Sequence, residues 1–147
     1  MFVGEAPGAE EDRTGKPFVG QAGKLLDGMI FALGFDRSEV FIANVVKCRP
    51  PKNRDPADDE MTECAELLER QIELIRPRVI VALGRVSARR LTGSAKSMGA
   101  LRGRWTSLGG IPLLATYHPA YLLRSPIDKR AVWEDLKAVR QRLAEKA

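Results

Sequence analysis

Short apolar runs alternate along the chain with segments in which apolar residues recur every three or four positions. The uninterrupted runs predict buried β-strands, and the periodic segments predict amphipathic helices. The expected strands are residues 1–3, 40–46, 78–83 and 111–117. The expected helices are residues 21–33, 56–76, 85–91 and 128–145. Because strands alternate with helices, the pattern predicts an α/β domain whose mostly parallel sheet is covered on both faces.

Local signals set the ends of the predicted helices. Gly34 follows the first helix and is a typical C-terminal residue. Asp55 is the expected N-cap of the second helix, with Pro56 in its first position and Pro77 beyond its end. The core faces of the second and last helices are expected to consist of Met61, Cys64, Ala65, Leu68, Ile72, Ile75, Val132, Leu136, Val139 and Leu143.

Length and composition describe a single folded domain, residues 1–147. With 44% hydrophobic and 29% charged residues, the chain is neither collagen-like nor disordered. No apolar run approaches the ~20 residues that cross a bilayer. The N-terminal sequence MFVGEAPG lacks the basic and apolar regions of a secretory signal. We therefore expect a cytoplasmic protein with no membrane partner.

Charge is unevenly distributed along the chain. The net charge is +5, and residues 76–127 contain nine basic residues and no acid, whereas residues 55–73 contain eight acids and one arginine. This separation predicts one positive side that contacts the phosphates of a nucleic acid. The alternative is that the basic residues only solvate a stretch of strand and loop.

Three loops leave the carboxyl ends of predicted strands, where ligands bind in open parallel sheets. The first loop contains Gly4, Glu5, Ala6, Pro7 and Gly8. Its glycines either let backbone N–H groups approach a ligand or form an ordinary tight turn. The loop is not a nucleotide P-loop, because the motif Gly-x-x-x-x-Gly-Lys-Ser/Thr is absent.

Asn44, His118 and Phe18 are the other candidates for chemistry. Asn44 lies in an apolar strand, and its amide is either a buried structural group or a reader of a base edge. His118 is the only histidine and follows the last predicted strand, where it is either structural or catalytic. Phe18 either packs against the following helix or provides a surface for stacking.

Taken in order, residues 4–27 (GEAPGAEEDRTGKPFVGQAGKLLD), 41–54 (FIANVVKCRPPKNR) and 118–124 (HPAYLLR) resemble the family 4 uracil-DNA glycosylases. The resemblance extends through practically the whole chain. It implies a three-layer α/β/α sandwich around a short, mostly parallel sheet. It also implies a DNA repair enzyme that flips uracil out of DNA and hydrolyses its N-glycosidic bond, leaving an abasic site.

The resemblance also implies roles for individual residues. Residues 4–8 match the loop that activates water, and Phe18 matches the aromatic residue that stacks on the base. Asn44 matches the amide that reads uracil through O4 and N3–H. His118 matches the histidine that supports the departing uracil anion, which a neutral imidazole does by donating to O2.

The resemblance does not assign the group that orients water, because better-known superfamily members have an aspartate where this chain has Ala6. We expect Glu5 to orient the water. Glu11 and Asp12 are the further candidates, and their alternative reading is that of solvated loop acids.

The last motif is expected to contact DNA. Leu122 or Leu123 is expected to enter the space left by the flipped base, and Arg124 to contact phosphate. The other leucine is expected to pack under the loop.

Cysteines are where the chain departs from the family. Relatives hold a [4Fe–4S] cluster with four cysteines, two of which match Cys48 and Cys64, and the upstream Cys-x-x-Cys pair is absent here. We expect the cluster to be incomplete or absent in this sequence. The explanations are a misassigned start or fragmentary gene, a deliberate or degraded fragment, and loss of the cluster in this lineage.

Other functions stay open at this point. One is an inactive relative that binds uracil-containing or abasic DNA without turnover. A more remote one is a nucleotide-processing enzyme outside DNA repair. A covalent uracil binder is disfavoured, because residues 45–54 contain no histidine. The expected partner is uracil-containing DNA, bound by a monomer.

Overall fold

The computed structural model describes residues 1–145, which form a five-stranded sheet in the order β2-β1-β3-β5-β4. Strands β1, β2, β3 and β5 are parallel, and β4 is antiparallel to β5. The strands are β1 (Phe2–Gly4), β2 (Ile42–Asn44), β3 (Ile80–Leu83), β4 (Trp105–Leu108) and β5 (Ile111–Thr116). The prediction of an α/β fold with a mostly parallel sheet is confirmed.

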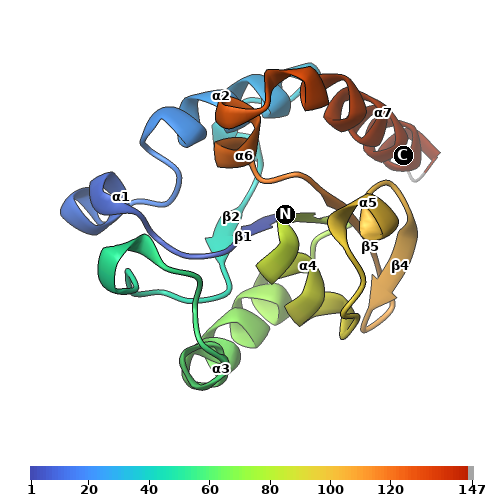
Figure 1. The fold of residues 1–147 in the computed structure, drawn as a ribbon. Coiled ribbons are helices and arrows are strands. Elements are labelled where there is room, and N and C mark those ends of the chain that lie inside the picture. The colour runs from blue at the N-terminus through green and yellow to red at the C-terminus, as the bar shows by residue number, and fades with distance from the viewer. Residues whose placement is uncertain (146–147) are drawn as a thin grey trace.

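Helices cover both faces of this sheet (Figure 1). The α-helices are α1 (Ala9–Thr14), α2 (Gln21–Ala32), α3 (Asp58–Ile75), α4 (Arg85–Thr92), α5 (Met98–Leu101), α6 (Pro119–Arg124) and α7 (Lys129–Glu145). Short 3₁₀ turns are η1 (Arg37–Glu39), η2 (Pro51–Asn53) and η3 (Pro126–Asp128). In Figure 1, α2, α6 and α7 lie on one side of the strands, and α3 and α4 lie on the other. Within the described residues, no helix is both long and apolar enough to cross a membrane.

Two separate cores hold the three layers together. In β3, Val81 and Leu83 belong to the core under α2 and α7, whereas Ile80 and Ala82 belong to the core under α3 and α4. Because successive strand residues point to opposite faces, a strand buried on both sides must be apolar throughout. The three-layer arrangement that the resemblance implied is therefore confirmed.

The predicted elements are incomplete in two places. The segment expected as a loop, residues 4–20, contains α1, whose side chains include none that is buried. The unassigned stretch between α4 and β5 contains α5 and the edge strand β4. Neither stretch shows the apolar periodicity on which the prediction depended.

The start of the second predicted helix is also corrected. α3 begins at Asp58, and Ala57 is its N-cap. The side chain of Glu60 accepts a hydrogen bond from the backbone N–H of Ala57 at 2.8 Å. Asp55 does not cap the helix but forms an ion pair with Arg85 at 2.7 Å. Ile75, expected in the core, is 43% exposed at the end of this helix.

Candidate active site

A cavity of about 230 Å³ opens where β1, β2 and β5 end. Residues 5–8 of the first loop line it together with Phe18, Asn44 and His118, although they come from four separate stretches of sequence, whereas Gly4 does not line it. The far wall is made of residues that precede α3. The lining residues are Glu5, Ala6, Pro7, Gly8, Glu11, Phe18, Ala22, Gly23, Asn44, Pro50, Asn53, Arg54, Asp55, Pro56, His118 and Ala120.

Asn44 brings an unsatisfied amide to this cavity. It ends β2 directly beside Gly4 of β1, and only 5% of its surface is exposed. Its Oδ1 is buried and has no hydrogen-bond partner among the residues described. A buried polar atom without a partner costs about 1–3 kcal/mol, and structures rarely retain one without a reason. The position is therefore suited to a ligand that donates a hydrogen bond.

Gly4 allows Asn44 and Phe18 to occupy the same corner. A Cβ on Gly4 would lie 2.4 Å from Cζ of Phe18 and 2.6 Å from Oδ1 of Asn44. No larger residue fits without displacing one of these side chains. The close approach explains why the first strand ends in glycine.

Phe18 forms an aromatic wall of the cavity. Its ring is buried, and its centroid lies 5.5 Å from that of His118 with an interplanar angle of 31°. This geometry leaves Phe18 and His118 on neighbouring sides of the space beside Asn44. A planar ring that enters can stack on one side chain and hydrogen-bond to the others.

His118 is held as a neutral imidazole. It is the N-cap of α6, and its Nδ1 accepts a hydrogen bond from the backbone N–H of Ala120 at 3.0 Å. Burial, together with the nearby charge of Arg124, lowers the pKa of His118 to about 4, although Glu11 acts in the opposite direction. With Nδ1 acting as the acceptor, the neutral ring carries its proton on Nε2, where it is available as a donor.

Glu5 is one of the carboxylates that line the cavity. Its Oε2 accepts from the backbone N–H of Val86 at 3.0 Å, at the start of α4. Burial raises the pKa of Glu5 above its ordinary value of 4.5; the Val86 bond opposes this rise, and Asp55 adds to it. The Val86 bond thus orients the carboxylate, which lines the cavity and can accept further hydrogen bonds there.

Sequence reasoning missed the residue that brings Glu5 and His118 together. Gly84 has a φ of +92°, and a Cβ there would lie 2.7 Å from Oε2 of Glu5 and 2.9 Å from Cβ of His118. The only signal in the sequence was a glycine between a strand and a helix. That signal does not reveal which side chains approach it.

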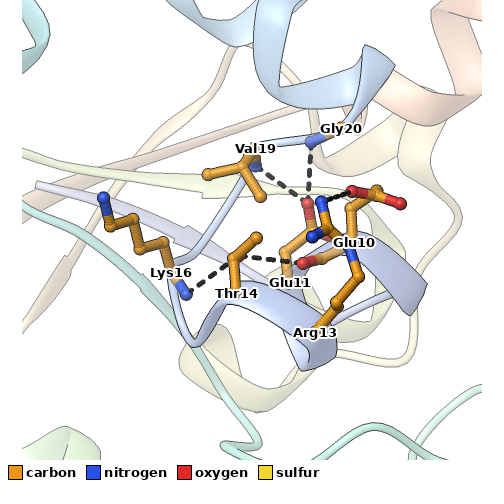
Figure 2. A network of polar contacts seen from close by, with 7 residues as sticks. All are labelled: Glu10, Glu11, Arg13, Thr14, Lys16, Val19 and Gly20. Carbon is orange, nitrogen blue, oxygen red and sulfur yellow. Dashed lines mark hydrogen bonds and ion pairs between the residues drawn. The ribbon is translucent and has the colours of Figure 1, made fainter.

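Glu11 also lines the cavity and makes local contacts that the sequence did not predict. Its carboxylate accepts from three backbone N–H groups, those of Gly8 at 3.0 Å, Val19 at 2.8 Å and Gly20 at 2.9 Å. Figure 2 shows it between α1 and the start of α2. Burial alone would raise the pKa of Glu11, but these bonds lower it below 4.5. Both oxygens of Glu11 are thus engaged by backbone N–H groups, so Glu11 is less free than Glu5 to accept a hydrogen bond from water.

Asp12, the third acid considered for the water, is exposed on α1 and does not line this cavity.

The leucines that follow His118 differ sharply. Leu122 is 1% exposed and belongs to the core beneath α6, whereas Leu123 is 46% exposed. Leu122 cannot reach DNA without leaving the core, so only Leu123 remains a candidate wedge. Arg124 is exposed beside it at the end of α6.

The two cysteines do not form a complete cluster site. Cys48 is exposed, and Cys64 is partly buried with its Sγ 3.4 Å from the backbone nitrogen of Lys47. A four-thiolate cluster needs two more cysteines than the sequence contains. Residues 1–145 also hold no group of three or more candidate metal ligands. The residues present therefore do not fit a [4Fe–4S] cluster, and no step of the chemistry below depends on one.

Known proteins match the chain over nearly its whole length. The family model described as the uracil DNA glycosylase superfamily matches residues 1–137. A type-4 uracil-DNA glycosylase of Saccharolobus solfataricus is 47% identical over 99% of this chain and 72% of its own length. Proteins of the same name from Sulfurisphaera tokodaii and Thermotoga maritima are 48% and 47% identical, over 96% and 93% of this chain and 68% and 73% of their lengths.

Proposed function

Because the chain belongs to the type-4 uracil-DNA glycosylases of the uracil DNA glycosylase superfamily, we propose that it hydrolyses the N-glycosidic bond of uracil in DNA and leaves an abasic site. The observation that carries the proposal is the buried Oδ1 of Asn44, which has no hydrogen-bond partner in the described part of the chain and belongs to a residue that lines the cavity with Phe18 and His118. Uracil supplies what this atom lacks, because its N3–H is a donor. Cytosine has an acceptor at the same position and would leave Oδ1 unpaired.

The cavity admits only a base that has left the DNA stack. Extrusion costs a few kcal/mol, which contacts in the pocket offset. Phe18 stacks on the uracil ring, and the Asn44 amide pairs with O4 and N3–H. On the surface, Leu123 fills the space that the base has left and Arg124 contacts phosphate.

His118 acts on the leaving group. Cleavage places negative charge on uracil, and a donor at O2 stabilises that charge more in the transition state than in the bound substrate. Its proton on Nε2 supplies this donor without an added charge, because the pKa of about 4 keeps the ring neutral.

Glu5 orients the water that attacks the sugar. Its bond to Val86 fixes the carboxylate, and its ionised form accepts a proton from water. Where the path is strongly dissociative, water needs little activation, so the loss of Glu5 is expected to cost less than the loss of Asn44 or His118.

The chain is proposed to act as a monomer, since every group in this scheme comes from one chain, and to act in the cytoplasm, where its DNA substrate lies.

Substitution of Asn44 tests the proposal. Asn44→Ala should reduce uracil release by roughly a hundredfold or more, because a site built for specific hydrogen bonds loses its reader. The measurement is single-turnover release from a uracil-containing oligonucleotide, followed by cleavage at the abasic site. Asn53→Gly is the matched control: Asn53 lines the same cavity with a φ of +55°, which glycine adopts freely, and its Oδ1 already accepts from Arg49 at 2.8 Å.

The wild-type protein also distinguishes the enzyme from the binding-only alternative. That alternative is not favoured, since the relatives are named as glycosylases. Retention of uracil-containing DNA without any abasic product would support it. Near-normal release by Asn44→Ala would show that Asn44 does not read the base.

A further inference from the structure

Phe18 has a backbone conformation that its own side chain disfavours. Its φ is +51°, in the left-handed region that residues with a Cβ rarely adopt. Such a conformation persists only where surrounding contacts enforce it. Contacts with other segments must therefore stabilise the backbone at Phe18.

Arg37 holds this segment by its carbonyl groups. It belongs to η1, after α2, and its Nη1 donates to the carbonyl oxygen of Phe18 at 2.8 Å while Nη2 donates to that of Pro17. Nη1 also donates to Oδ1 of Asp27 at 2.7 Å, which fixes the guanidinium on α2. One planar group thus holds two consecutive carbonyls, a geometry for which the arginine fork is suited.

The other contacts of the segment complete this restraint. Glu11 accepts from the N–H groups of Val19 and Gly20, as Figure 2 shows. On α2, a Cβ at Gly23 would lie 1.9 Å from the carbonyl oxygen of Phe18, so the same carbonyl lies against the helix. Among the described residues, only Arg37 donates a charged hydrogen bond to the carbonyl oxygen of Phe18.

We propose that Arg37 is a positioning residue for base stacking: it fixes the left-handed backbone at Phe18 and so keeps the ring beside Asn44 and His118. Arg37 does not line the cavity and acts only through Phe18. This inference rests on the proposed function for its catalytic consequence. Its structural consequence, the position of the Phe18 ring, is measurable whether or not uracil is the substrate.

The first test uses His118 as a reporter. Because the chain has a single histidine, its imidazole proton signals in an NMR spectrum are unambiguous. The Phe18 ring, 5.5 Å away, shifts those signals through its ring current. Arg37→Ala should move them toward their position in Phe18→Ala. Asp27→Asn, which removes the ion-pair partner and leaves both carbonyl bonds possible, should leave them in place.

The second test is a double-mutant cycle on single-turnover uracil release. Arg37→Ala should lower the rate about tenfold, in keeping with the cost of small misplacements in an active site. In the Phe18→Ala background the same substitution should change the rate less than twofold, because Arg37 then has nothing to position. Arg37→Lys should fall between Arg37→Ala and wild type, since an ammonium cannot span both carbonyls as the guanidinium does.

The outcomes separate the two proposals. Unchanged His118 signals in Arg37→Ala, or an equal loss of rate in the presence and absence of Phe18, would overturn the role of Arg37. If Arg37→Ala fails to fold, Arg37→Lys carries the same comparison. Absence of uracil release from the wild-type protein would overturn the proposed function alone, because the NMR result does not depend on turnover.

Discussion

His118 is a titratable group that folding forces to remain neutral. Burial and the charge of Arg124 lower its pKa to about 4, from an ordinary value of 6.5. Between these two pH values the unfolded chain binds a proton that the folded protein does not. The free energy of unfolding should therefore decrease as the pH falls from 6.5 toward 4, and it should be insensitive to this residue above 6.5.

The size of the effect follows from the two pKa values. At pH 5 the unfolded histidine is almost fully protonated, and the folded one is almost fully neutral. His118 should therefore lower the free energy of unfolding by about 2 kcal/mol between pH 6.5 and pH 5, at ~1.4 kcal/mol per pH unit. Glu5 acts in the opposite direction, because its pKa is raised above 4.5 and the folded protein binds its proton more readily. The contribution of His118 must therefore be isolated with a variant.

His118→Asn isolates it, since asparagine can still accept from the N–H of Ala120 as an N-cap and does not titrate. Urea unfolding at pH 5 and pH 8 measures the free energy of unfolding of both proteins. The wild type should lose about 2 kcal/mol more than His118→Asn between the two pH values. An equal loss in both would refute the reasoning, because it would mean that His118 protonates freely in the folded state.

The remaining predictions concern Glu5 and Arg124. In wild type, the single-turnover rate of uracil release should fall when acidification protonates Glu5, whose pKa is raised. Glu5→Gln should lower the rate about tenfold or more and remove that part of the pH profile. An unchanged profile would exclude Glu5 as the group that orients water. Arg124→Ala should weaken DNA binding and reduce the slope of log K against log salt by roughly one, without changing the preference for uracil over cytosine. Arg70→Ala, on the acidic face of α3, is the control and should leave the slope unchanged; an altered base preference in Arg124→Ala would contradict a pure phosphate contact.

The sequence could predict the elements whose burial is periodic. β3 is buried at all four residues, as expected. On α7, the expected core residues Val132, Leu136 and Val139 are buried. α1 was missed because its residues, AEEDRT, have no apolar face and depend on local bonds at Gly8 and Glu11. β4 was missed because it is an edge strand that is partly exposed along its length.

The candidate site was predictable as a set of residues and not as a set of contacts. Strand ends placed Asn44 and His118 at one edge of the sheet, because parallel strands share the direction in which they end. The bond between Glu5 and Val86 joins residues 81 positions apart, and no local pattern indicates such a pair. The prediction that Asp55 caps α3 was wrong for the same reason, because its carboxylate accepts a hydrogen bond from Arg85, 30 positions away.

Three residues that line the cavity are in a locally unfavourable state. Asn44 has a buried oxygen without a hydrogen-bond partner among residues 1–145, His118 is desolvated, and Phe18 has a left-handed backbone. Each state costs free energy in the protein alone, and the two apolar cores, one on each face of the sheet, must supply the stability that sustains them. A ligand with a donor at one edge and a flat face relieves the first cost directly, through Oδ1 of Asn44. Substitutions that relax Phe18 or satisfy Asn44 internally should therefore stabilise the fold while weakening the site, because the strained arrangement is the one that matches the base.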